Sequence, residues 1–286
     1  MSNKTSKNQS IFQKNIKVKI LGYVFLVFCT LLVAYPLIFI LFTSFKSNAE
    51  FFVNLFGVPR VPEWRNYPDA WGVGHLGTYF FNSLFITSTS VLGCVIVALL
   101  AGYALAKLRI PKADLIMSAF MTFSFIPGIA IYISLYTMQN QLGIHGYTAM
   151  IFPYIAWSLP LSMFILKQYF ETVPTDLVES ARIDGCNEFQ TFRSIMLPLV
   201  TPAIATVVVF NFISNWGELM WANIVTSAST SIKTLPVGLL NFKTEMGTNW
   251  GQYTAGICMV TIPLMVVFAF CQKYFVAGLT NGAVKG

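Results

Sequence analysis

Six long apolar runs constrain the fold of this chain more than any other feature. A helix that crosses a bilayer needs about 20 predominantly apolar residues. The 286-residue sequence meets that length at residues 20–42, 80–106, 115–138, 147–166, 199–224 and 254–272. Because lipid offers no hydrogen-bond partners, backbone groups must pair within their own segment, which favours helices. We therefore predict an all-α integral membrane protein with six transmembrane helices.

The composition argues against a water-soluble globular protein. Only 10% of the residues are charged and 56% are hydrophobic, whereas soluble domains are charged at about 25% of positions. A net charge of +7 can indicate nucleic-acid binding in a soluble protein. Here the basic residues lie in short segments between the apolar runs, which is typical of membrane orientation. We predict contact with membrane lipid and no nucleic-acid partner.

The placement of lysine and arginine predicts the orientation. With the N-terminus in the cytoplasm, inner segments hold 13 of the 18 basic residues and outer segments hold 5. The positive-inside rule favours this arrangement, which makes both termini cytoplasmic. The predicted segments are a cytoplasmic tail at 1–19, the first span at 20–42, an external loop at 43–79, a core of five spans at 80–275 with an inner loop at 173–198, and a cytoplasmic tail at 276–286.

The spans carry few groups that could drive transport or chemistry. Glu218 is the single carboxylate in the six predicted runs, which hold no lysine, arginine or histidine, whereas ion-coupled carriers use several such groups. The sequence contains no G-x-x-x-x-G-K-[ST] nucleotide loop. Its five cysteines fit neither a disulfide nor a metal site. We expect no catalytic residue, metal or cofactor on this chain and an energy source on a partner.

The inner loop at 173–198 is too patterned for a simple connector. Thr175 or Asp176 can cap a short helix, with Glu179 completing a capping box. Gly185 occupies the position of a left-handed residue that ends this helix. Asn187 can then cap a second helix, whose apolar face follows helical spacing at Phe189, Phe192, Ile195 and Met196. We predict a cytoplasmic pair of helices, bent at Gly185, that docks on a soluble partner.

The same loop resembles the E-A-A-x3-G-x9-I-x-L-P motif of ABC-importer permeases. The motif positions are occupied by Glu179, Ser180, Ala181, Gly185, Ile195, Leu197 and Pro198. Ser180 departs from the motif alanine but remains small. The resemblance implies a coupling helix that sits in the cleft of an ATPase subunit, formed by Glu179, Ser180, Ala181, Arg182, Ile183, Asp184 and Gly185.

The resemblance extends over nearly the whole chain to the carbohydrate class of these permeases, the six-span maltose-type inner-membrane subunits. It rests on Asn82–Ser83, Ala101–Lys107, Ile126–Pro127, Arg182–Gly185, Thr234–Leu239 and Gly282–Gly286. It implies a multi-pass protein of the bacterial inner membrane that works with a second permease, two ATPase subunits that hold ATP and Mg, and an extracytoplasmic solute-binding protein. The implied substrate is an oligosaccharide or another sugar, with glycerol-3-phosphate or a polyol as the alternative, and the sugar pocket lies largely on the other permease.

Three polar residues are candidates for the translocation path. Glu218 can line the path or lie at the membrane interface beside Trp216 and Trp221. Asn211 and Asn215 are four residues apart and share a helix face. They can line a polar path or hydrogen-bond to neighbouring spans. Pro127 and Gly128 are expected to kink the third span.

A stand-alone membrane channel or enzyme is the competing interpretation. It requires a selectivity-filter motif, a metal constellation or a cluster of catalytic groups, and the sequence offers none of these.

Overall fold

The computed structural model describes residues 2–283 apart from residues 228, 230, 245 and 246. Within this part of the chain, the regular structure is helical except for a short ladder between β1 (Lys243–Thr244) and β2 (Gly247–Thr248). Four helices are long and apolar enough to cross a membrane, and the number rises to six if each of two bent helix pairs forms one span. The predicted all-helical class is thus confirmed.

The chain divides into two compact units, of which the first comprises residues 1–70 and 244–258. Its helices are α1 (Ser2–Ser44), α2 (Asn48–Val53), α3 (Asn66–Gly72) and the beginning of α14 (Trp250–Ala283). The predicted external loop at 43–79 therefore contains two short helices.

A buried lysine organises the segment after α1. Lys46 is fully buried, and its Nζ donates to the carbonyl oxygens of Asn54 at 2.6 Å and Leu55 at 3.0 Å. Burial lowers the pKa of Lys46, and the Glu50 carboxylate offsets part of that change. The two carbonyl oxygens replace the water that the ammonium group loses on folding.

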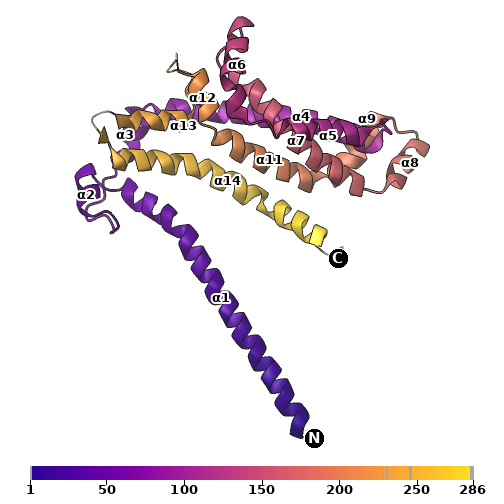
Figure 1. Cartoon of the computed structure of the whole chain (residues 1–286), viewed down its shortest axis with the longest axis horizontal. Coiled ribbons are helices and arrows are strands. Elements are labelled where there is room, and N and C mark those ends of the chain that lie inside the picture. The colour runs from indigo at the N-terminus through magenta and orange to yellow at the C-terminus, as the bar shows by residue number, and fades with distance from the viewer. Residues whose placement is uncertain (1, 228, 230, 245–246, 284–286) are drawn as a thin grey trace. The chain divides into compact units, whose positions relative to one another are not determined.

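The second unit comprises residues 71–243 and 259–286. Its elements, most of which are labelled in Figure 1, follow one another along the chain. They are α4 (Leu76–Lys107), α5 (Ala113–Phe123), α6 (Gly128–Gln141), α7 (Thr148–Thr172), α8 (Thr175–Ile183), α9 (Glu188–Thr191), a π-helical turn (Phe192–Met196), α10 (Leu197–Leu199), α11 (Thr201–Trp216), α12 (Met220–Val225), α13 (Leu235–Leu239), a 3-10 turn (Leu240–Phe242) and the rest of α14.

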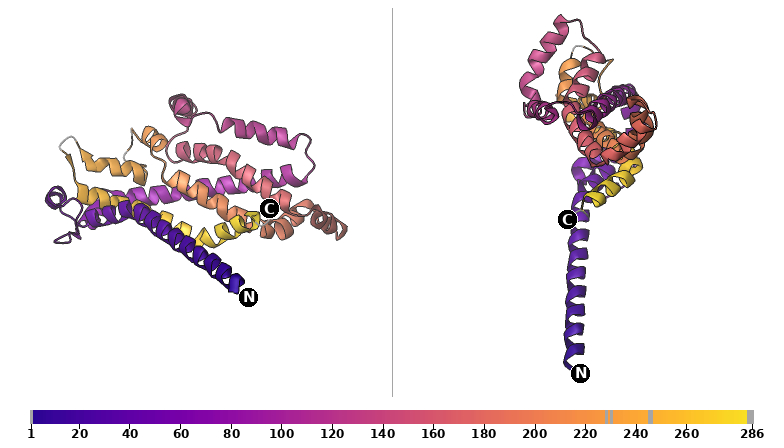
Figure 2. Two further views of the ribbon diagram at one scale, coloured as in Figure 1. Left: turned by 60° about the horizontal axis from the view of Figure 1, so that its bottom comes forward. Right: turned by 90° about the vertical axis from the view of Figure 1, so that its right-hand side faces the viewer.

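The core of this unit is the packing of α4 against α7, with α11 against both (Figures 1 and 2). A small residue permits the close approach of α4 and α7. A Cβ atom on Gly102 would lie 3.2 Å from both the Leu166 Cβ and the backbone nitrogen of Lys167. Membrane helices commonly pack through such small residues. This trio of helices positions the α7–α11 connection, which contains the predicted docking loop.

The predicted third span, at 115–138, is not one continuous helix. It is broken into α5 and α6, whose axes differ by 88°. Pro127 lies at the break, as the N-cap of α6. Proline has no N–H to donate and its ring clashes with the carbonyl of the preceding turn, which disfavours a continuous helix. The predicted kink at Pro127 and Gly128 is therefore a full break.

The predicted fifth span, at 199–224, is also interrupted. Helix α11 ends at Trp216, and the chain leaves the helix before α12 begins at Met220. At its other end, α11 meets the preceding helical segment, Glu188–Leu199, at 76°.

The last helix, α14, continues to Ala283. The last three residues of the predicted tail, 284–286, lie outside the described residues.

Candidate functional site

Helix α8 forms the first half of the loop between α7 and α11, and Gly185 ends it. Gly185 has a φ of +83°, in the left-handed region. Its N–H donates to the Arg182 carbonyl, and the Cys186 N–H donates to the Ala181 carbonyl. This pair of bonds is the Schellman arrangement, which satisfies the last carbonyls of a helix and turns the chain. The predicted bend at Gly185 is present.

The predicted cap at the start of α8 is wrong. The helix begins at Thr175 directly after Pro174, which occupies the N-cap position without any side-chain hydrogen bond. Neither Thr175 nor Asp176 is therefore the cap, and Asp176 lies in the first turn instead. Its negative charge there interacts favourably with the positive end of the helix dipole.

The second half of the loop begins with a capping box. The Asn187 side chain accepts from the Gln190 N–H, and the Gln190 side chain accepts from the Asn187 N–H, both at 2.8 Å. The sequence predicts the Asn187 cap but not its partner Gln190. The α-helical face predicted beyond it is only partly correct, because the chain widens into a π-helical turn at Phe192–Met196 and Phe189 is exposed.

The predicted coupling residues present a mixed surface. Ala181 is buried together with Val178, so one side of α8 packs inward. Ile183 is 86% exposed, so the outer side of α8 includes an apolar side chain. The remaining predicted residues of this segment are all exposed, namely Glu179, Ser180, Arg182, Asp184 and Gly185.

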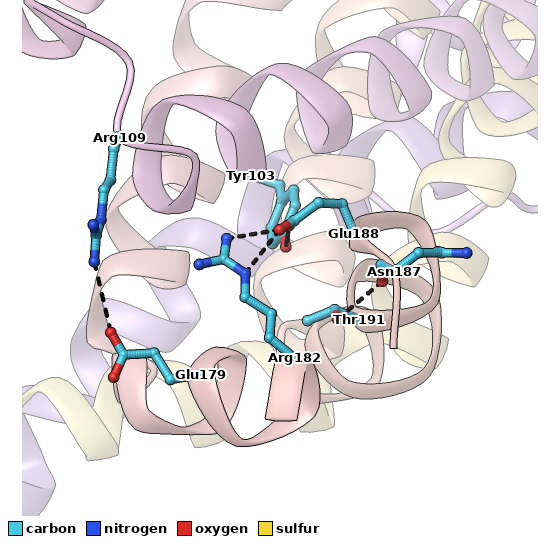
Figure 3. A network of polar contacts seen from close by, with 7 residues as sticks. All are labelled: Tyr103, Arg109, Glu179, Arg182, Asn187, Glu188 and Thr191. Atoms are coloured by element: carbon cyan, nitrogen blue, oxygen red, sulfur yellow. Dashed lines mark hydrogen bonds and ion pairs between the residues drawn. The ribbon is translucent and has the colours of Figure 1, made fainter. Parts of the chain in front are cut away.

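A polar network braces the bend and ties it to α4 (Figure 3). The Arg182 guanidinium pairs with Glu188 Oε1, with Nη2 at 2.7 Å and Nε donating at 2.8 Å. The Tyr103 hydroxyl on α4 donates to the other oxygen of Glu188 at 3.1 Å. The bend at Gly185 makes the first contact possible, because residues six apart lie far from each other on a straight helix.

Two further contacts accompany this network. The Lys107 ammonium at the end of α4 donates to the Val173 carbonyl at 2.6 Å, where α7 ends. The Arg109 side chain lies 3.7 Å from Glu179, and both groups are exposed. An exposed ion pair at this distance contributes little stability. The loop is thus attached to α4 mainly through Glu188 and the backbone of Val173.

A second site lies away from the loop, where α5, α6, α7 and α11 surround a cavity of about 490 Å³. All three predicted path residues line it, namely Asn211, Asn215 and Glu218. The Asn211 Nδ2 donates to Ser162 Oγ on α7 at 3.0 Å and contacts Cys94 Sγ on α4 at 3.4 Å. Asn211 therefore joins neighbouring helices as well as facing the cavity.

Glu218 lies in the break between α11 and α12, and protein donors occupy both of its oxygens. One oxygen accepts from the Trp221 N–H at 2.8 Å, and the other accepts from the Ala222 N–H at 2.9 Å and the Tyr154 hydroxyl at 2.8 Å. These bonds satisfy the first free N–H groups of α12. The carboxylate therefore also holds α12 against α7.

Lys167 on α7 directly follows the fourth predicted span, which ends at residue 166. In the structure α7 continues to Thr172, and the Lys167 side chain is only 3% exposed. Its ammonium pairs with Asp114 of α5 at 2.8 Å and with Glu171. The spacing of Lys167 and Glu171 indicates the second pair, whereas the pair with Asp114 depends on the tertiary packing.

These features identify the class of protein to which the chain belongs. Within the described residues, no group of three histidine, cysteine, aspartate or glutamate side chains could hold a metal ion. The apolar helices, the braced loop and the cavity define a polytopic membrane permease. The chain belongs to the family of binding-protein-dependent transport system inner membrane components, which matches residues 95–281.

Several curated relatives of this chain are permease proteins of transport systems for sugars or sugar derivatives. The trehalose/maltose transport system permease protein MalG of Thermococcus litoralis is 35% identical over 85% of this chain and 83% of its own length. The diacetylchitobiose uptake system permease protein DasC of Streptomyces coelicolor is 31% identical over 88% and 92%. The sulfoquinovosyl glycerol transport system permease protein SmoH of Agrobacterium fabrum is 31% identical over 88% and 89%.

Solved structures share the fold. A crystal structure of a bacterial ABC transporter that imports the acidic polysaccharide alginate matches 92% of this chain and 98% of its own, with a TM-score of 0.78 and 24% identity. The inward-facing MetNI methionine ABC transporter matches 73% of this chain and 97% of its own, with a TM-score of 0.56 and 18% identity.

Proposed function

We propose that this chain is one of two permeases in an ATP-driven sugar importer of the bacterial inner membrane. It spans the membrane six times, with both termini and the α7–α11 loop in the cytoplasm. The excess of basic residues in the inner segments supports this orientation. One of the six spans is the bent pair of α5 and α6, and another contains α11, which meets the cytoplasmic segment Glu188–Leu199 at 76°.

The proposed partners are a second permease, two ATPase subunits and a solute-binding protein outside the cytoplasm. ATP and Mg bind to the ATPase subunits and not to this chain, which carries no P-loop sequence. A solved structure with this type of fold is an alginate transporter in complex with its pentasaccharide-bound periplasmic protein, which supports the last partner. The named sugars of the relatives support a saccharide cargo, with glycerol-3-phosphate or a polyol as the alternative.

The braced bend at Gly185 is the observation that carries this proposal. An exposed helix fixed to α4 and α7 can transmit a push from an ATPase subunit into the bundle, whereas a flexible loop would absorb it. Closure of the ATPase pair then favours one state of the bundle over the other. The chain acts by differential stabilisation of these states.

Replacement of Gly185 by valine tests this role. A β-branched residue at a positive φ is strained by about 1–2 kcal/mol, so the bend relaxes and the docking surface is displaced. We expect Gly185→Val to lose most of the ATPase subunit that co-purifies with the wild-type importer, and most of the ATP-driven uptake. The measurement is the ratio of ATPase to permease after affinity purification.

Gly143 provides a matched control between α6 and α7. It also has a positive φ, of +69°, and at both glycines a Cβ would meet no atom within 4 Å. Gly143→Val therefore introduces comparable local strain at a site outside the loop. Equal ATPase retention by Gly185→Val and Gly143→Val would contradict the docking role of the loop.

A further inference from the structure

The segment between α1 and α3 carries an exposed apolar patch. Five of its large apolar side chains are at least 64% exposed, namely Phe52, Val53, Phe56, Val58 and Val61. We call these five residues the loop patch. Between positions 51 and 62 the sequence holds a single charged residue, Arg60. Apolar side chains gathered in this way on a surface indicate that another apolar phase or molecule covers it.

Several polar groups of this segment are bonded within it. Lys46 is buried against the carbonyl oxygens at the end of α2. The Glu50 Oε1 atom accepts from the Arg60 N–H at 2.7 Å and from Asn54 Nδ2 at 3.3 Å. Internal hydrogen bonds thus replace water at these groups. The outward surface of the segment is formed largely by the loop patch.

Hydrogen bonds tie the far end of the segment back to the outer end of α1. The Glu63 N–H donates to the Phe45 carbonyl at 2.8 Å. The buried Asn66 Nδ2 donates to the carbonyl oxygens of Ser44 at 3.0 Å and Lys46 at 2.9 Å. The segment is therefore a closed loop, and the loop patch cannot move far from the end of α1.

Within this closed loop the chain folds back along α1. The ring of Phe56 lies 6.0 Å from that of Phe39, centroid to centroid. Phe39 belongs to the first predicted span and precedes the end of α1 by five residues, which is about 7.5 Å of helix. Val58 shares a groove of about 220 Å³ with Leu41 and Phe42, and all the residues that line this groove are apolar. The loop patch thus continues the apolar surface of α1, whose span is 0% buried.

We propose that the loop patch is a membrane anchor that inserts into the outer leaflet and packs against the acyl chains of phospholipids. Trp64 then lies in the headgroup layer, because its ring is 4.7 Å from that of Phe45, just beyond α1. Indole rings favour this layer, and the Arg60 side chain can extend into it. The anchor fixes the depth of the outer end of α1 in the bilayer. This inference goes beyond the proposed transport function and does not depend on the cargo.

Spin labels test whether the loop patch contacts lipid. The importer is prepared with its five native cysteines replaced by serine and with one new cysteine, from Val53→Cys, Phe56→Cys or Val61→Cys. Each variant carries a nitroxide and is placed in nanodiscs of phosphatidylethanolamine and phosphatidylglycerol. Oxygen concentrates among acyl chains, whereas a nickel chelate stays in water. The measurement is the ratio of nitroxide collisions with oxygen to those with the chelate.

Val73→Cys is the matched control. Val73 is 81% exposed, close to the 79% of Val53, and it precedes the second predicted span by seven residues. We expect the collision ratio to be several-fold higher at the three patch positions than at Val73. A ratio equal to that at Val73 would overturn the anchor.

Two other results would assign the loop patch to a protein and also overturn the anchor. If the solute-binding protein covers it, the chelate reaches the labels until that protein is added. If the second permease covers it, both reagents collide rarely with the labels. ATP-driven uptake by the same samples is measured separately. Loss of uptake in the unlabelled importer bears on the proposed function, whereas the collision ratio alone decides the anchor.

Discussion

At the scale of single residues, Glu188 connects the two halves of the loop to the bundle. Its carboxylate forms an ion pair with Arg182 of α8 and accepts a hydrogen bond from the Tyr103 hydroxyl of α4. The side chains of Arg182 and Glu188 are 42% and 47% exposed, so water screens their attraction. An exposed ion pair contributes at most about 1 kcal/mol. Glu188 therefore contributes mainly to the position of the loop and little to overall stability.

Replacement of Glu188 by glutamine should loosen the loop without unfolding the protein. The variant keeps a group that can bond to Tyr103 but loses the charge that holds Arg182. We expect backbone amide exchange in α8 and α9 to accelerate by at most about fivefold, because local opening reports the local free energy. Hydrogen-exchange mass spectrometry on the purified chain measures this.

Arg109→Gln is the control for this experiment. Its contact with Glu179 is longer, at 3.7 Å, and its side chain is 84% exposed. We expect exchange in the loop to stay at the wild-type rate. Equal acceleration in the two variants would mean that the loop responds to any nearby charge, and Glu188 would have no special position.

At the scale of elements, α5 and α7 are joined by a charge cluster with one buried member. Lys167 is buried, whereas its partners are open to solvent, with side-chain exposures of 92% for Asp114 and 39% for Glu171. Removal of the lysine and removal of its carboxylate partners have different consequences for stability. Carboxylates that lose their partner regain water, but a buried ammonium group cannot.

This asymmetry predicts opposite outcomes for two variants. Lys167→Met removes the buried charge and keeps the side-chain length, so we expect the midpoint of thermal unfolding to change little or to rise. The double variant Asp114→Asn with Glu171→Gln leaves the ammonium unpaired and should destabilise the protein by about 3–5 kcal/mol. Tryptophan fluorescence during heating in detergent measures both. A larger fall in the unfolding midpoint for Lys167→Met than for the double variant would contradict this account.

The same elements show how far sequence reasoning extends. The apolar runs predict the long helices well, because lipid permits few alternatives to a helix. The breaks beside Pro127 and after Trp216 divide two of the predicted spans. Hydropathy does not predict these breaks, because the apolar pattern continues across a break and does not report its angle. In the loop, Gly185 and Asn187 are predicted correctly, since a left-handed turn and a capped start favour particular residue types. The widened turn at Phe192–Met196 has no comparable signature.

Contacts between distant segments could not be predicted. The contact of Tyr103 with Glu188, and the position of Trp157 and Asn215 around one cavity, depend on how α4, α7 and α11 pack. Pairs of opposite charge give some indication, because a bend at Gly185 brings Arg182 toward Glu188. An aromatic ring within an apolar run gives none, since lipid and the protein interior favour the same side chains.

At the scale of the whole molecule, the extent of burial does not follow hydrophobicity. The strongly apolar stretch of α1 is 0% buried, whereas that of α7, the least apolar of the four long spans, is 56% buried. Helices inside the bundle can pair polar side chains such as Ser162 and Asn211 with each other. A helix that faces lipid has no such partners, so its sequence must remain apolar.

The native Cys186 allows a direct test of the proposed orientation. It is partly exposed and lies directly after Gly185. In a variant with Cys29, Cys94, Cys258 and Cys271 replaced by serine, we expect a membrane-impermeant maleimide to label Cys186 in inverted vesicles and not in intact cells.

A second cysteine reports the opposite face. Trp64 lies in the predicted external loop and is 68% exposed. Introduced into a cysteine-free chain, Trp64→Cys should be labelled in spheroplasts and protected in inverted vesicles. Labelling of both positions from the same side would exclude the proposed topology.

The π-helical turn at Phe192–Met196 sets the direction in which α8 and α9 point relative to α11. In this turn the Leu197 N–H bonds to the Phe192 carbonyl, five residues back instead of four. Each α-helical residue advances the chain by about 100° around the axis. Deletion of one residue here would let the turn tighten into an α-helix, and everything from α8 to α9 would swing by about 100° relative to α11. A chain shortened in this way could fold and enter the membrane, and α8 would still point away from the proposed ATPase subunit.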